Sequence, residues 1–345
     1  MNTASFRTTA LIATGSALLL LLSGCFNFGV LQPDNTTKPT GEDVPAALVP
    51  YYTQVLDWAD CDNGMECATA KAPMDWANPS PETDIELALV RHPATGTKQG
   101  SLFTNPGGPG ASGFDFVYDS LDFAASADLQ AAFDVVGWDP RGVGRSSAVK
   151  CYEAPELDAF IFGLPQAPRG TQAWIDEVTQ SSIDFGKACL ENTGELLQFI
   201  DTQSTVHDLD MLRAVVGDPK LNYLGYSYGS DIGSYYVENF PDKVGRLVVD
   251  GATDSSISVF EVGLVQTKGF QRALENYLKA CPDLFDDCPF TGDLTTDLAT
   301  IRGLYDRYDA SPVAAPDGRM MDAGVLDIAM SMALYSQDSW PFLND

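Results

Sequence analysis

Gly225, Ser227 and Gly229 form a G-x-S-x-G pattern whose serine has the surroundings of a nucleophile. The pattern follows a short apolar strand predicted at residues 221–224 and opens a helix predicted at 228–240. Such a strand–turn–helix segment holds a serine hydroxyl exposed at a helix start, where backbone amides favour negative charge. The flanking glycines have no Cβ to clash where strand and helix cross. The alternative is a serine that only caps the helix.

A glycine-rich segment, NPGGPG at residues 105–110, follows another predicted strand. An acyl-transfer enzyme needs two N–H donors for its oxyanion, one from the residue after the nucleophile and one from a loop of this kind. We expect the Tyr228 amide to be the first donor and the Gly108 amide the second, with Gly107 in reserve. The alternative is a plain turn.

The general base is the missing part of this pattern. The sequence holds two histidines, His92 and His207, and both precede Ser227. His207 lies in the first turn of a predicted helix, where the helix dipole would oppose its protonation and so suit a base. We favour the interpretation that His207 is a surface histidine flanked by acids, and we consider His92 a still weaker candidate for the base. Asp250 closes a predicted strand and is interpreted as structural.

Composition limits the partners. Of 345 residues, 48 are acidic and 20 basic, a formal net charge of -28. Such a chain repels nucleic acid and anionic lipid headgroups, so we expect neither as a partner. The charge is explained by the solubility of an exported surface, although it would also favour amine-bearing substrates. We expect no cofactor.

The N-terminus predicts export. Arg7 precedes an apolar run at residues 10–22, and LLSGC at 21–25 resembles the bacterial lipoprotein box. We therefore expect a signal peptide at 1–24 and a lipid on Cys25, with the alternative of an ordinary cleaved signal. Residues 25–48 are rich in Pro, Thr and Asp and are predicted to be a lipid-anchored linker. The protein would then lie on the extracytoplasmic face of the cell membrane and touch the membrane only through its lipid.

The remaining six cysteines form an even set, which in an oxidising compartment predicts disulfides. Fifteen pairings are possible, and sequence proximity favours Cys61–Cys67, Cys151–Cys189 and Cys281–Cys288. A zinc site is the alternative, but no C-x-x-C pair or clustered histidine accompanies these cysteines. We expect no metal.

Strands and helices alternate along the chain. Strands are predicted at residues 85–90, 101–104, 133–138, 221–224 and 244–249, and helices at 205–216 and 228–240. Ordered structure is expected to begin near Tyr51. The alternation predicts an α/β domain at 49–254, with a mainly parallel sheet covered on both faces. Residues 255–345 turn helical and acidic and are predicted to form a helical cap.

Four segments occur in one order: NPGGPGASG, VVGWDPRGVGRSS, LNYLGYSYGS and RLVVDGATD. Together they resemble the α/β-hydrolase peptidases of the proline iminopeptidase and actinobacterial tripeptidyl aminopeptidase group, over roughly residues 70–254. The resemblance implies Ser227 as nucleophile, the Gly108 and Tyr228 amides as oxyanion hole, and a cap that restricts access to peptide ends. Asp139 and Arg141 would brace the loop beside the site.

The sequence departs from this group after the nucleophile. The fold places the acid and then the histidine last, yet no histidine follows Ser227. We therefore expect the C-terminal strands and catalytic segment to be missing and this chain to be inactive as it stands. The predicted function is a cell-surface serine exopeptidase acting on peptides with a free N-terminus. Acids at Glu261 or between Asp283 and Asp287 could bind the amine. Alternatives are a carboxylesterase and a non-catalytic lipoprotein.

Overall fold

A computed structural model of the protein describes residues 35–344. Its centre is a seven-stranded sheet in the order β1-β2-β3-β5-β4-β6-β7. The strands are β1 Ala59–Asp60, β2 Glu66–Pro73, β3 Asp84–His92, β4 Ser101–Asn105, β5 Asp134–Trp138, β6 Leu221–Tyr226 and β7 Val244–Asp250. The predicted signal peptide and Cys25 lie outside the described residues.

The sheet has two parts with different pairing. Strands β5, β4, β6 and β7 are mutually parallel and contain the predicted strands that carry the motifs. Strands β1, β2 and β3 pair antiparallel, and β3 joins β5 antiparallel. Strand β2 was not predicted, because its small and polar residues lack the β-branched run that marks the others.

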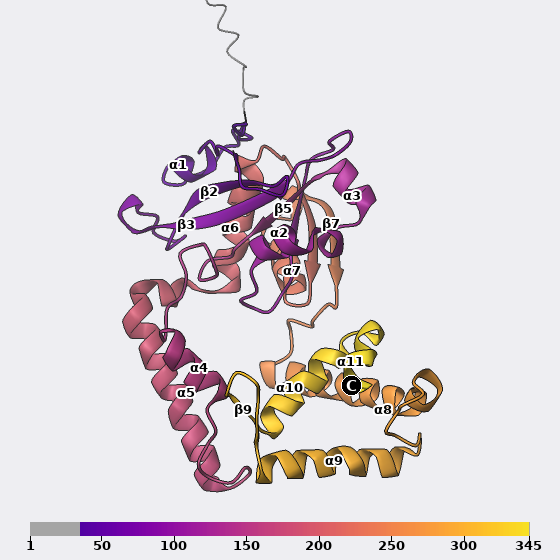
Figure 1. The fold of residues 1–345 in the computed structure, drawn as a ribbon. Helices are drawn as coiled ribbons and strands as arrows, with labels where there is room; N and C mark the ends of the chain where they lie inside the picture. Colours follow the sequence, from indigo (N-terminus) through magenta and orange to yellow (C-terminus); the bar gives the residue numbers. More distant parts are fainter. Residues whose placement is uncertain (1–34, 345) are drawn as a thin grey trace, which may run out of the picture. The chain divides into compact units, whose positions relative to one another are not determined.

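Helices cover both faces of the sheet (Figure 1). One face packs against α1 Val49–Tyr52, α6 Thr202–Val215 and α7 Gly229–Asn239, and the other against α2 Gly113–Ala124 and α3 Ala127–Ala132. In α6, Val206, Leu209 and Leu212 are fully buried at the predicted helical spacing. Each such side chain contributes about 1.5–3 kcal/mol. The side chain of Asp201 caps this helix by accepting the Ser204 N–H.

Ordered structure begins upstream of Tyr51, so part of the predicted linker at 25–48 packs on the domain. We call residues 37–48 the N-terminal strap. The Thr37 N–H donates to the Leu56 carbonyl at 2.9 Å and the Thr40 N–H to the Ala214 carbonyl at 2.9 Å. The Glu42 carboxylate accepts from Arg213 at 2.8 Å. The composition of the linker could not predict this docking, because Ala214 and Arg213 lie far away in the sequence.

The region after residue 255 is mostly helical, as the sequence predicted. It consists of α8 Val259–Leu284, α9 Leu294–Ala310, α10 Ala323–Leu334 and α11 Trp340–Asn344, with a short hairpin of β8 Val313–Ala314 and β9 Met320–Met321. These helices have their own apolar core, which includes Leu278, Ile301 and Trp340. No helix among residues 35–344 is long and apolar enough to cross a membrane.

Two further helices, α4 Ala154–Phe162 and α5 Gln172–Thr193, come between β5 and α6 in the sequence. In Figure 1 they extend away from the sheet toward β9 and α9. The loop that joins them contacts the helices after residue 255, since Arg169 pairs with Asp309 and Asp322, each at 3.0 Å. The helical region is therefore built from two separate stretches of sequence, whereas the sequence predicted only the second.

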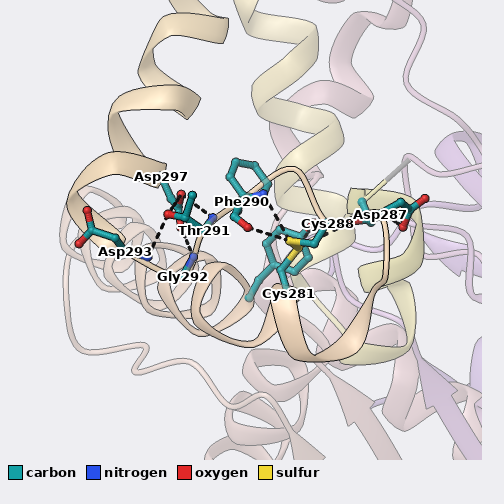
Figure 2. Close-up of a disulfide and its surroundings, with 10 residues drawn as sticks. Cys281, Asp287, Cys288, Phe290, Thr291, Gly292, Asp293 and Asp297 are labelled. Carbon is teal, nitrogen blue, oxygen red and sulfur yellow. Dashed lines mark hydrogen bonds between the residues drawn. A yellow bond between two sulfur atoms is a disulfide. The ribbon is translucent and has the colours of Figure 1, made fainter.

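The structure contains the three disulfides that proximity favoured. Cys281–Cys288 joins the last turn of α8 to the loop that follows it (Figure 2). Beside it the buried Asp297 carboxylate accepts the N–H groups of Thr291 and Gly292 at 3.0 and 2.8 Å. The disulfide and this carboxylate together fix the turn between α8 and α9.

Candidate active site

Ser227 occupies the sharp turn between β6 and α7. Its backbone is left-handed, with φ of 52°, a conformation that costs a residue with a side chain about 1–3 kcal/mol. The flanking elements hold it there. The Ser227 N–H donates to the Asp250 carbonyl at 2.8 Å, and the Ser227 carbonyl accepts the Ser230 N–H at 2.8 Å.

The glycines of the pattern are required by close backbone contacts. A Cβ on Gly225 would collide with the Gly229 carbonyl, and one on Gly229 would lie 2.7 Å from the carbonyl oxygen of Asn105. The second contact brings the start of α7 against the end of β4. The β6–Ser227–α7 turn and the glycine-rich loop after β4 are therefore neighbours.

Gly107 is the point at which this loop meets the serine. A Cβ at Gly107 would lie 2.8 Å from the Cβ of Ser227 and 3.0 Å from the Tyr228 nitrogen. Only a glycine lets the loop approach this closely. The Gly107 N–H itself donates to the Asn105 side chain at 2.9 Å, so that amide is bonded within the loop. The structure thus brings Ser227, the Tyr228 amide and the glycine-rich loop together.

The Tyr228 side chain is fixed from a neighbouring helix. Its hydroxyl lies 2.7 Å from Thr202 Oγ1, in the first turn of α6. Burial raises the pKa of the Tyr228 phenol, so the hydroxyl stays neutral. Thr202 thereby helps position the residue whose amide borders Ser227. This contact could not be predicted from the sequence, because Thr202 and Tyr228 lie on different elements.

Asp139 and Arg141 lie in the loop after β5 and have bracing contacts, as predicted. Asp139 Oδ1 accepts from the Ser112 hydroxyl at 2.5 Å and Oδ2 from the Arg145 N–H at 2.7 Å. The first bond ties this loop to the residue that caps α2, just after the glycine-rich segment. Arg141 is buried and pairs with Asp208 at 2.7 Å.

His207 is not the surface residue we expected. Its ring stacks on Trp76 with centroids 5.5 Å apart and meets the edge of Phe240 at 5.3 Å. Burial lowers the pKa of its imidazole. Phe240 follows the last turn of α7, whereas Ser227 precedes the first, a separation of roughly 16 Å along this helix. The structure therefore does not bring His207 to Ser227.

His92 lies at the other edge of the sheet. It ends β3 and pairs with Val135, near the amino end of β5. Strand β6 runs parallel to β4 and β5, and Ser227 follows the carboxyl end of β6. The two residues therefore lie at opposite ends of the parallel strands. Asp250 is near the serine, and its backbone carbonyl accepts the Ser227 N–H. Burial raises the pKa of the Tyr226 phenol, and the charge of the Asp250 carboxylate raises it further.

Two of the acids considered for amine binding, Glu261 and Asp287, make contacts within the protein. Glu261 accepts the N–H and hydroxyl of Ser258 at 2.9 and 2.8 Å, and so caps the start of α8. Asp287 accepts from the Asn344 side chain at 3.0 Å. The capping contacts account for Glu261 without a ligand.

Comparison with known families decides the affiliation of the fold. A family model described as alpha/beta hydrolase fold matches residues 101–298, which is more than half of the chain. The chain belongs to the α/β-hydrolase fold family. The matched range includes the glycine-rich loop, the Ser227 turn and the bracing loop after β5, as the sequence resemblance implied.

Three curated relatives match different shares of the chain. Serine protease Hip1 of Mycobacterium tuberculosis is 33% identical over 314 residues, which are 86% of this chain and 59% of the relative. Tripeptidyl aminopeptidase of Streptomyces lividans is 38% identical over 213 residues, 58% of this chain and 39% of the relative. Carboxylesterase B of Mycobacterium tuberculosis is 37% identical over 319 residues, 89% of this chain and 60% of the relative. The α/β-hydrolase chain described here therefore spans less than two thirds of the length of these relatives.

Proposed function

We propose that Ser227 is the nucleophile of a serine hydrolase that cleaves peptides near a free N-terminus through an acyl-enzyme. In this reaction the Ser227 Oγ attacks the scissile carbonyl and the amine leaves, and water then releases the acyl group. The observation that carries the proposal is the left-handed Ser227, with φ of 52°, held against Gly107 and the Tyr228 amide. Peptidase chemistry is supported by the resemblance to a serine protease and a tripeptidyl aminopeptidase.

The oxyanion would be bound by the amides of Tyr228 and Gly108. Gly108 is favoured over Gly107 because the Gly107 N–H is bonded to the Asn105 side chain. An amide used within the loop has no hydrogen left to donate to a developing oxyanion.

The base and its acid are proposed to lie outside these 345 residues. No histidine follows Ser227, and the contacts of His92 and His207 place both away from it. We further propose that the protein is exported, with its lipid on Cys25. The 345-residue chain alone should then show little or no turnover.

Labelling with a fluorophosphonate tests the nucleophile, since this probe modifies only an activated serine. The product of the complete reading frame should be labelled at Ser227, and Ser227→Ala should abolish the label. Ser182→Ala is the matched control, because this serine lies exposed on α5. A complete protein that stays unlabelled under conditions in which a known serine hydrolase reacts would favour the non-catalytic binding lipoprotein instead.

A carboxylesterase is the second candidate. It is supported by the 37% identity to Carboxylesterase B over 89% of this chain. A panel of three substrates separates the two activities: a peptide with a free amine, the same peptide N-acetylated, and a short-chain ester. Hydrolysis of the free-amine peptide alone supports the exopeptidase, whereas hydrolysis of the ester alone supports the esterase.

A further inference from the structure

The loop after β7 runs directly beside the turn that holds Ser227. Asp250, the last residue of β7, accepts the Ser227 N–H at 2.8 Å through its backbone carbonyl. Gly251 follows with a φ of 64°, and a Cβ there would lie 3.7 Å from the Ser227 nitrogen. This loop is the second half of the RLVVDGATD segment, so one of the four segments of the family resemblance contacts the backbone of the nucleophile.

Thr253 attaches this loop to the first turn of α7. Its N–H donates to Ser230 Oγ at 3.1 Å, and its hydroxyl donates to Asp231 Oδ1 at 2.5 Å. Ser230 is buried, which shields the first bond from competing water. The second bond has a carboxylate acceptor, and such bonds are shorter and stronger than those between neutral groups.

These contacts close a ring around the nucleophile. The Ser227 N–H bonds the Asp250 carbonyl, and the Ser227 carbonyl accepts the Ser230 N–H, each at 2.8 Å. Thr253 comes three residues after Asp250 and bonds Ser230, so it joins the two ends. The ring resists rotation about the Ser227 backbone, whose left-handed φ of 52° is unfavourable for a residue with a Cβ. Such a conformation persists only where its surroundings hold it from several sides.

We propose that Thr253 is a positioning residue for the nucleophile. It holds the first turn of α7 so that Ser227 keeps its left-handed backbone and the Tyr228 N–H stays directed at the oxyanion. The inference rests on the proposed serine hydrolase function. Thr253 takes no part in bond making, because its hydroxyl hydrogen is donated to Asp231 and its N–H to Ser230.

The place of Thr253 in the chain explains why this fastening matters. Residues 251–258 are mostly exposed and lead from β7 into α8. Exposed connecting loops move more than the elements they join. Thr253 fastens the loop to α7 close to its start, so motion of the exposed part beyond it is kept from Ser227.

Two substitutions in the complete protein test this role. Thr253→Val removes the hydroxyl and keeps the shape of the side chain, whereas Thr253→Ser keeps the hydroxyl. We expect Thr253→Val to slow fluorophosphonate labelling of Ser227 about tenfold, the effect of a slightly misplaced reacting group, and Thr253→Ser to label within about twofold of the parent. With a peptide substrate the loss should appear in kcat and leave KM unchanged, because a positioning residue alters the reacting geometry and not ground-state binding.

Thr291→Val is the matched control. It removes a threonine hydroxyl that donates to Asp297 at 3.0 Å in the helical region after residue 255. We expect it to lower the melting temperature about as much as Thr253→Val does and to leave the labelling rate unchanged. This control separates the position of Ser227 from a general loss of stability.

Hydrogen exchange followed by mass spectrometry tests the geometry without using activity. In Thr253→Val the amides of Ser227 and Ser230 should exchange about tenfold faster than in the parent, because the turn opens more often. Unchanged exchange refutes the ring as the fastening of this turn. Faster exchange with a parent-like labelling rate, or a Thr253→Ser variant as slow as Thr253→Val, refutes the positioning role of the hydroxyl. A parent protein that is not labelled refutes the proposed hydrolase, whereas the exchange rates still decide whether Thr253 holds the turn.

Discussion

Replacing Asp208 by asparagine should be among the most destabilising single changes in the domain. The Asp208 carboxylate is fully buried and accepts from Arg141 Nε at 2.8 Å and Nη2 at 2.7 Å. It also accepts from the indole N–H of Trp76 at 3.0 Å. An asparagine of the same size turns an N–H₂ donor toward one of these donors and leaves the guanidinium charge uncompensated.

The expected loss is about 3–5 kcal/mol in the free energy of unfolding, the cost of breaking a buried ion pair. Urea denaturation followed by circular dichroism measures it, together with a melting temperature that should fall by roughly 10 °C. Asp184→Asn is the matched control. That residue pairs with Lys187 at 3.0 Å on the exposed surface, where water and salt screen the pair, so its loss should leave the free energy of unfolding almost unchanged.

The comparison between the two variants can refute the reasoning. If Asp208→Asn lies within about 1 kcal/mol of Asp184→Asn, the buried pair does not contribute to stability as argued. If instead the loss reaches the expected size, fluorophosphonate labelling of the complete protein should also slow, because Arg141 lies in the loop that braces the start of α2.

Four further predictions follow from other parts of the chain. Gly107→Ala should lower the labelling rate of the complete protein about 100-fold or more by displacing an oxyanion donor; an unchanged rate would contradict the close approach at Ser227. Serines in place of Cys281 and Cys288 should lower the unfolding free energy by about 2–3 kcal/mol, measured in urea against the unreduced parent, and no loss would mean that the loop is fixed by other contacts. Burial lowers the pKa of His207 in the folded state, so below the ordinary histidine pKa of about 6.5 the unfolded chain binds more protons than the folded one. The free energy of unfolding should therefore fall as the pH drops below about 6.5. His207→Gln should flatten this part of the stability profile, and an equally steep profile in the variant would contradict the argument. Cys25→Ser should release the protein from the membrane fraction on cell fractionation, and retention there would contradict the lipid anchor.

The sequence predicted the parts of the fold in which local signals agree. The apolar runs that became β4, β5, β6 and β7 end at glycine-rich or charged loops, so both the strands and the edge that carries the site could be inferred. The Ser227 turn was predictable because its glycines meet a steric requirement within a few residues. These inferences depend on neighbours in sequence, where periodicity and turn chemistry carry information.

What the sequence missed depends on residues that meet only in three dimensions. The ring of His207 is covered by Trp76 and Phe240, residues more than thirty positions away on either side. The docking of the strap depends on partners more than 150 residues downstream. Helices α4 and α5 were not predicted, and most of their residues are exposed.

The fastening of the strap also constrains the order in which the protein can fold. Glu42 leaves the ribosome early, but its partner Lys243 follows about 200 residues later. Contacts of such large sequence separation form slowly, since a long loop must close before they contribute. The strap and the amino ends of β6 and β7 therefore assemble only after the chain has been synthesised as far as Lys243. Until then water solvates the Arg213 guanidinium, which is buried in the folded domain.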